Sequence, residues 1–279
     1  MPGFWTVGLT SGLPEAKRDY VKELRRNGAP IQLQQIASEQ TMGEALRILI
    51  DPHLATPEAT VTEISALPLT ILGVGHSSPI MAVSMSGDGG WRDLDKTIGE
   101  SLQRRGIPVV GWDSLRYFWS LKTPQQTADD LADVMRTFTV RWHAREVALI
   151  GYSFRADVMP FAYNRLPDKL RSRVALMALL GFANEADFQV TVGGWLRETP
   201  GPEALPTLSE VNKIPPSMML CLYGQIEKDT ACPALGQRGV EVIRTTGGHH
   251  FDGNYEALTD RIVAVLSRRI ARSSPTEIP

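Results

Sequence analysis

The chain has 279 residues, which is enough for one α/β domain of ordinary size and an additional segment. Hydrophobic residues make up 43% of the sequence and charged residues 22%, a composition that excludes a wholly disordered chain. The formal net charge of −2 gives no electrostatic reason to expect a nucleic-acid partner.

The sequence contains no recognisable targeting or membrane-spanning segment. Its longest apolar stretch, Val174 to Ala183, is far shorter than the roughly 20 residues that span a bilayer. The first residues lack the basic and apolar regions of a secretory signal peptide. Two explanations remain: a cytoplasmic protein, or a sequence that begins partway through a longer chain.

The N-terminal segment predicts a partial α/β unit. Its hydrophobic periodicity predicts a strand, a helix, a strand and a helix at Phe4 to Gly8, Pro14 to Asn27, Ile31 to Ile36 and Met42 to Ile50. The same order recurs from Met219 to Leu266. We therefore interpret residues 1–55 as a degenerate copy of the end of the main domain, and the alternative is a chance resemblance.

The main domain is expected over residues 66–272, between a Pro/Thr-rich linker at 56–65 and a flexible tail at 273–279. Strands and helices alternate along it, with strands expected at Ile80 to Met85, Ile107 to Gly111, Glu146 to Ile150, Arg173 to Leu180, Met218 to Tyr223 and Val240 to Arg244. This alternation predicts a mostly parallel sheet with helices on both faces. Ligands of such sheets bind at the carboxyl ends of the strands.

A glycine–serine motif lies between a predicted strand and the helix after it. Ser153 follows Gly151 and Tyr152, as the nucleophile does in the G-x-S-x-G elbow of α/β hydrolases. Arg155 stands where that motif has its second glycine, so its side chain is expected to displace the elbow or to reach solvent or a carboxylate. Arg155→Gly is then expected to raise both thermal stability and activity.

An acid and a histidine follow Ser153 in the order that this fold requires. His249 comes directly after the last predicted strand and is the favoured base, with His250 as the alternative. Asp229, in the loop after the preceding strand, is the favoured acid, and Glu227 in the same loop is the alternative. These residues predict an α/β-hydrolase fold with a catalytic triad.

A glycine-rich turn follows the first strand of the main domain. In α/β hydrolases this loop supplies one oxyanion donor, and the residue after the nucleophile supplies the other. We assign these roles to the N–H group of Asp88 or Gly89 and to that of Phe154. A phosphate-binding loop is the competing interpretation, which the lack of a following Gly-Lys-Ser/Thr disfavours. No metal and no cofactor is expected.

Two cysteines occur near the predicted acid. Cys221 lies in a predicted strand and Cys232 in the loop after it. One interpretation is two buried thiols. The other is a disulfide that ties the loop to its strand and requires an oxidising compartment.

Five segments resemble the AcvB/VirJ family of bacterial virulence proteins, over about residues 66–272. They are SGDGGWRDLDKTIGE from Ser86, GWDSLRYFW from Gly111, GYSF-x-ADVMPFAYNRLP from Gly151, EKD-x-ACP from Glu227 and GGHHFDGNY from Gly247. The resemblance implies a periplasmic protein linked to type IV secretion of T-DNA and effectors. AcvB-type members have two tandem domains, which implies that residues 1–55 are the tail of a truncated first domain.

The resemblance also implies a reaction. AcvB-type members are implicated in hydrolysing lysyl-phosphatidylglycerol, so the expected function is a serine esterase acting on an aminoacylated phospholipid at the membrane surface. Asp113 is the candidate partner of the substrate ammonium, unless it caps the next turn, and Trp91 and Trp112 are candidate substrate contacts, unless they belong to the core. The rival hypothesis is a non-enzymatic accessory protein that presents effectors to the secretion machine and uses the fold as a scaffold.

Overall fold

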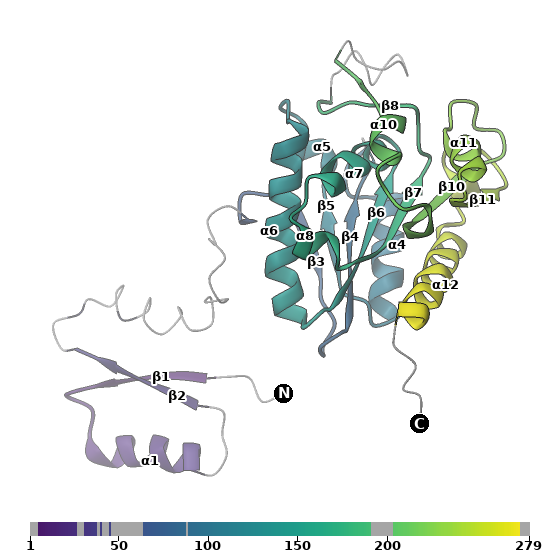
Figure 1. Ribbon diagram of the computed structural model, residues 1–279. Coiled ribbons are helices and arrows are strands. Elements are labelled where there is room, and N and C mark those ends of the chain that lie inside the picture. Colours follow the sequence, from purple (N-terminus) through teal and green to yellow (C-terminus); the bar gives the residue numbers. More distant parts are fainter. Residues whose placement is uncertain are drawn as a thin grey trace. The chain divides into compact units, whose positions relative to one another are not determined.

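The computed structural model describes residues 5–26, 31–37, 40, 45, 64–87, 89–190 and 203–273. The chain divides into two compact units, Met1–Ala59 and Thr60–Pro279 (Figure 1). Among the described residues, none of the helices has the length and apolarity that crossing a membrane requires.

The first unit contains two parallel strands joined by a helix. Strand β1 (Trp5–Thr10) and strand β2 (Ile31–Ile36) pair in register, and helix α1 (Glu15–Arg26) makes the crossover that parallel pairing needs. The strand–helix–strand order expected from the sequence is present. The second expected helix, from Met42 to Ile50, lies almost entirely outside the described residues, and the origin of this unit as a copied domain end stays a prediction.

The second unit is built on a seven-stranded sheet in the order β11-β10-β7-β6-β4-β5-β3. All neighbouring strands are parallel except β3, which pairs antiparallel with β5 at one edge. The sequence analysis did not anticipate β3. The strands are β3 (Leu69–Leu72), β4 (Ile80–Met85), β5 (Val109–Trp112), β6 (Glu146–Tyr152), β7 (Val174–Leu180), β10 (Met219–Gly224) and β11 (Glu241–Thr245).

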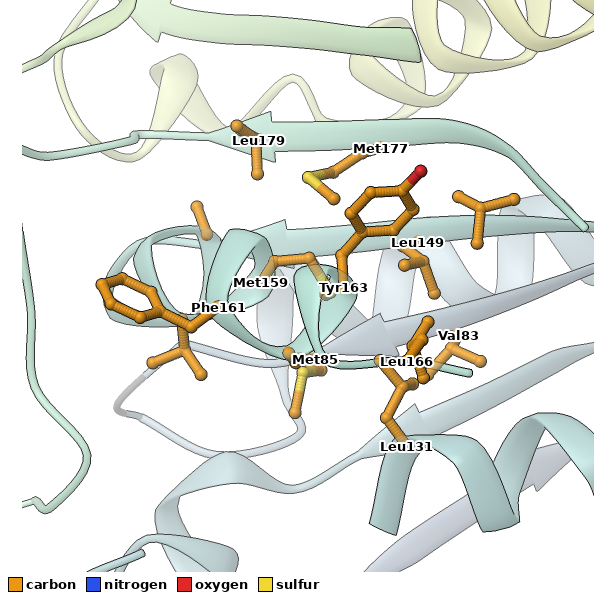
Figure 2. Close-up of a cluster of buried hydrophobic side chains, with 14 of the residues drawn as sticks. Val83, Met85, Leu131, Leu149, Met159, Phe161, Tyr163, Leu166, Met177 and Leu179 are labelled. Atoms are coloured by element: carbon orange, nitrogen blue, oxygen red, sulfur yellow. The ribbon is translucent and has the colours of Figure 1, made fainter. Parts of the chain in front are cut away.

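Helices cover both faces of this sheet, because successive side chains of a buried strand point to opposite faces. In β4, Met81 and Val83 pack into the cluster formed with α6 (Pro124–Trp142) and α7 (Phe154–Asn164), as Figure 2 shows for Val83. Ala82 belongs to the other cluster, with α4 (Asp93–Arg104) and α12 (Tyr255–Ser273). The short helix α8 (Asp168–Arg171) follows α7.

The expected start of α6 is confirmed in detail. Thr123 caps the helix, Pro124 is its first residue, and Gln126 returns a side-chain hydrogen bond to the backbone N–H of Thr123. This reciprocal arrangement satisfies two N–H groups that would otherwise have no partner inside the helix.

Short elements lie at the carboxyl ends of the strands. After β5 comes α5 (Ser114–Tyr117), and the segment that follows pairs with the region after β7: the N–H of Lys122 donates to the carbonyl of Phe188, and that of Val190 to Phe118. The remaining elements are β8 (Glu185–Ala186), β9 (Leu205–Pro206), α10 (Leu208–Val211), η1 (Pro216–Met218), α11 (Cys232–Gln237) and η2 (Phe251–Gly253). Strands β8 and β9 pair antiparallel, which ties the long β7–β10 connection together.

Candidate active site

Ser153 occupies a sharp turn between β6 and α7. Its backbone has φ 56° and ψ −137°, a conformation that costs energy in any residue other than glycine. The turn is held by its N–H group, which donates to the carbonyl of Leu180 at 2.7 Å. A Cβ atom on Gly151 would lie 2.7 Å from the carbonyl oxygen of Arg155, so the elbow requires glycine there. The strand-to-helix turn expected for Ser153 is confirmed.

Three side chains from three different strand ends form a hydrogen-bonded relay. The Ser153 Oγ lies 2.6 Å from Nε2 of His249, and Nδ1 of His249 lies 2.6 Å from Oε1 of Glu227. Since a carboxylate can only accept, Nδ1 carries the proton and Nε2 is left to accept from the serine hydroxyl. The side chain of Glu227 is 10% exposed and that of His249 is 39% exposed, so solvent reaches the base from one side. The expected approach of Ser153 and His249 is confirmed.

The acid at the imidazole is Glu227, and the preference for Asp229 was wrong. Glu227 is folded back onto the end of β10: its N–H donates to the carbonyl of Gly224 at 3.0 Å, and its Oε2 accepts from the Gly224 N–H at 3.3 Å. This tight turn aims the glutamate at His249. Asp229 lies two residues further along the loop and is exposed.

Two residues that the sequence analysis passed over hold the base in place. Tyr152 stacks on the imidazole of His249, with ring centroids 5.2 Å apart and planes inclined by 29°. Gly181, at the end of β7, has φ +63°, and a Cβ atom there would lie 2.7 Å from Cε1 of His249. A glycine directly after a buried strand was the available signal for the second residue. His250 is exposed and contacts the Tyr152 hydroxyl instead of Ser153.

The glycine-rich turn after β4 passes beside Ser153. A Cβ atom on Gly87 would lie 3.7 Å from the Cβ of Ser153. The Gly87 N–H donates to Oδ2 of buried Asp95 at 3.3 Å, and burial raises the pKa of that carboxyl well above its ordinary range. Gly89 faces the guanidinium of Arg92, and Asp88 lies outside the described residues. The oxyanion role expected for Asp88 or Gly89 therefore stays a prediction.

Phe154 is the first residue of α7. The first N–H groups of a helix have no acceptor within it, and the helix dipole there favours negative charge. This placement fits the oxyanion role expected for the Phe154 N–H, which also stays a prediction.

Arg155 neither displaces the elbow from the triad nor reaches solvent. Its side chain is fully buried, and its guanidinium carbon lies 3.6 Å from the ring centroid of Phe154 and 3.9 Å from that of Phe118. The rings accept the cation on their faces, which the sequence argument did not consider. Asp157 is buried nearby; burial raises the pKa of its carboxyl, and the charge of Arg155 opposes that rise. Asp157 also accepts from the Ala183 N–H at 2.7 Å.

The three candidate substrate contacts serve the fold. Trp112 is fully buried in the core. The Trp91 ring covers Gly111, where a Cβ atom would lie 2.5 Å from the indole. Asp113 caps α5 by accepting from the N–H of Arg116 at 3.1 Å. Burial of Trp112 gives it the core role that was the alternative, whereas Trp91 is only partly buried, and its contact with substrate stays a prediction.

A disulfide joins Cys221 of β10 to Cys232 at the start of α11, with Cα atoms 5.6 Å apart. Of the two interpretations left open by the sequence, the disulfide is confirmed. It closes the loop that carries Glu227. The same loop is tied to the end of β7, because the Ala231 N–H donates to the carbonyl of Phe182 at 2.8 Å.

A mostly parallel sheet with helices on both faces and a serine elbow, a histidine and an acid at its carboxyl end defines an α/β-hydrolase-fold protein. Residues 79–270 match the family described as bacterial virulence protein (VirJ). Because the match covers more than half of the sequence, the chain belongs to this family. No curated protein matches the sequence.

Several solved structures are similar to this chain, and the one with a TM-score of 0.50 agrees on the fold. A thermophilic esterase from Thermogutta terrifontis, with malate bound, is 18% identical with a TM-score of 0.50, covering 73% of this chain and 93% of its own. The esterase Est1E from Butyrivibrio proteoclasticus, with ferulic acid bound, is 11% identical with a TM-score of 0.49, covering 74% and 96%. An alpha-beta serine hydrolase homologue from Coxiella burnetii is 16% identical with a TM-score of 0.46, covering 70% and 89%.

Proposed function

We propose that this chain is a serine esterase in which Ser153 is the nucleophile, His249 the general base and acid, and Glu227 the group that orients the imidazole. The observation that carries the proposal is the unbroken relay from Ser153 Oγ through His249 to Glu227, with both hydrogen bonds at 2.6 Å. In this geometry the serine proton already faces the nitrogen that would accept it.

The reaction follows from the relay. Ser153 Oγ attacks the ester carbonyl while its proton passes to Nε2 of His249, and Glu227 stabilises the imidazolium that forms. The tetrahedral oxyanion is stabilised by the Phe154 N–H and by the turn after β4. His249 then gives its proton to the leaving alcohol, which departs and leaves an acyl group on Ser153. Water activated by His249 hydrolyses that acyl-enzyme and restores the serine.

The proposed substrate is the aminoacyl ester of lysyl-phosphatidylglycerol, so that the lysyl group passes to Ser153 and phosphatidylglycerol leaves. This substrate is the one implied by the resemblance to AcvB-type members; the family match itself names no substrate. Exposed large apolar side chains in the segments that follow β5, β7 and β10 also support a lipid substrate. These are Trp119, Leu121, Leu205, Leu208 and Ile226.

The disulfide supports a periplasmic location, because such bonds persist in oxidising compartments and are rare in the cytosol. Accessory function in type IV secretion, with effectors as partners, remains the second candidate through family membership. An arginine in place of the second elbow glycine would favour that candidate if it disturbed the elbow. Since Arg155 is accommodated between two rings while Ser153 still meets His249, it is no argument against catalysis.

A fluorophosphonate probe, which reacts with activated serines, tests the catalytic part of the proposal. We expect covalent labelling of the purified chain and none of Ser153→Ala. The substrate is tested by incubation with vesicles containing lysyl-phosphatidylglycerol, with mass spectrometry of released lysine and of phosphatidylglycerol. Labelling without release of lysine would support the serine-esterase proposal and overturn the proposed substrate. The absence of labelling would overturn both proposals.

A further inference from the structure

The residue before the nucleophile contacts both histidines of the pair. Tyr152 ends β6 and is buried. Besides stacking on His249, its hydroxyl donates to the backbone carbonyl of His249 at 3.2 Å and lies 3.0 Å from Nδ1 of His250. The Tyr152 side chain therefore contacts the ring and the backbone of His249 and the ring of His250.

The hydrogen-bond donors and acceptors of this cluster indicate how His250 contacts Tyr152. A phenol has one proton, and a carbonyl oxygen can only accept. For both contacts to be hydrogen bonds at once, the proton of Tyr152 goes to the carbonyl of His249, and Nδ1 of His250 donates to the phenol oxygen.

The turn that carries His249 needs such support. Phe251 and Asp252, directly after the pair, both have positive φ, at 52° and 53°, which costs energy in residues other than glycine. Gly247 and Gly248 precede the pair, and glycines leave the backbone many alternatives. The backbone is therefore strained after the histidine pair and conformationally free before it. Such a turn requires side-chain contacts to stay in one conformation.

We propose that Tyr152 and His250 are positioning residues that clamp the turn bearing His249 to the strand bearing Ser153. Tyr152 and Ser153 are adjacent in the chain, so the clamp sets the distance between nucleophile and base directly. The inference rests on the proposed function for its catalytic consequence. It gives the second histidine a role outside the relay, as a donor to Tyr152.

Tyr152→Phe tests the clamp, because phenylalanine keeps the stacked ring and loses the hydroxyl. We expect the maximal rate of fluorophosphonate labelling to fall about tenfold to a hundredfold, since small displacements of reacting groups are costly. The probe concentration for half-maximal rate is expected to stay unchanged, because the clamp does not contact the probe. A merely structural loss would instead lower the fraction of chain that can be labelled.

His250 variants supply the matched comparison. His250→Ala removes the donor and should lower the maximal rate, whereas His250→Asn places an amide nitrogen near the position of Nδ1 and should restore most of it. In the double variant Tyr152→Phe/His250→Ala, the loss of maximal labelling rate should be smaller than the two single losses combined, as expected for residues that share one contact. Wild-type rates in Tyr152→Phe, or equal rates in the alanine and asparagine variants, would overturn the clamp.

Nitrogen-15 NMR of the imidazoles separates this inference from the proposed function. We expect the Nδ1–H form of neutral His250 in the wild type and a mixture of tautomers in Tyr152→Phe. An Nε2–H form in the wild type would overturn the clamp, even in a chain that the probe labels. The opposite result is also distinguishable. If the probe does not label the chain, but His250 is in the Nδ1–H form and loses it in Tyr152→Phe, the esterase proposal is wrong and the clamp is supported.

Discussion

Arg155 stabilises the elbow at the position where a glycine was expected. Its buried side chain fills the space between Phe118 and Phe154, and its charge opposes the rise that burial causes in the pKa of Asp157. Phe118 also accepts a backbone hydrogen bond from Val190, so the arginine links the nucleophile helix to the segments that cover the strand ends. The residue supports the structure around Ser153, contrary to the expectation from its size and charge.

We predict that Arg155→Gly lowers the free energy of unfolding by about 2–5 kcal/mol, the range for deleting a large buried side chain. Arg155→Met keeps much of the volume and removes the cation, so it should cost less in packing while leaving Asp157 without its compensating charge. Chemical denaturation of both variants measures the two effects. If Arg155→Gly were as stable as the wild type, the packing of Arg155 between the Phe118 and Phe154 rings would contribute nothing to the free energy of unfolding.

A second prediction at this scale separates the two acids of the β10–α11 loop. Glu227→Gln removes the charge that stabilises the imidazolium and should reduce ester hydrolysis about a thousandfold or more. Asp229→Asn is the matched control, because Asp229 is exposed in the same loop and should leave turnover near that of the wild type. Hydrolysis of a chromogenic ester measures both, and a larger loss in Asp229→Asn would reverse the assignment.

At the scale of elements, the sequence predicted most of the sheet. The buried strands are continuous apolar runs bounded by polar or glycine residues, so Ile80–Met85 was predicted at its observed bounds. The cap of α6 was predicted because the two residues that make it lie within one turn of the chain. Strand β3 was missed because it has only four residues, three partly buried and one exposed, and so short a segment at a sheet edge carries little periodicity.

The site was predicted less completely than the sheet. Ser153 and His249 follow strands directly and could be placed from topology. The choice of Glu227 depends on a backbone turn at Gly224, and the role of Gly181 depends on how closely His249 approaches it. These are contacts between segments far apart in sequence, and no local pattern specifies them.

The loop that carries Glu227 depends on its disulfide. We predict that replacing both Cys221 and Cys232 by alanine lowers the free energy of unfolding by about 2–4 kcal/mol, the usual range for a lost native disulfide. Turnover should fall as well, because Glu227 lies within the loop that the bond closes. Urea unfolding measures the first effect, and thiol titration of the denatured, unreduced wild type should find no free thiol. An unchanged midpoint with unchanged turnover would contradict the prediction.

At the scale of the whole second unit, exposed apolar side chains gather at the carboxyl-end face of the sheet. Trp119 is 64% exposed, and its segment is hydrogen-bonded to the region after β7. By contrast Val140, which is 54% exposed, lies near the end of α6, shortly before β6 begins, and therefore near the amino ends of the strands. Trp119 and Val140 are therefore a suitable test position and control position for binding to a membrane surface.

We predict that the chain co-sediments with phosphatidylglycerol-containing vesicles and that Trp119→Ser together with Leu121→Ser weakens binding at least about tenfold, from the apolar area removed. Val140→Ser, at the other end of the sheet, should bind as the wild type does. Equal weakening by all variants would show general loss of folding, and no effect of the first pair would place the membrane contact elsewhere.

Nucleophile, acid and base follow three different strands, and the acid and the base come from β10 and β11, which lie at one edge of the sheet and are the last to be synthesised. A nascent chain that has completed the elbow still has no base to activate Ser153. Chemical competence therefore arises only when the final quarter of the sequence adds to the sheet. Under the proposed function, a chain still being synthesised therefore cannot react with esters until β10 and β11 have been made and the loops after them have brought Glu227 and His249 to Ser153.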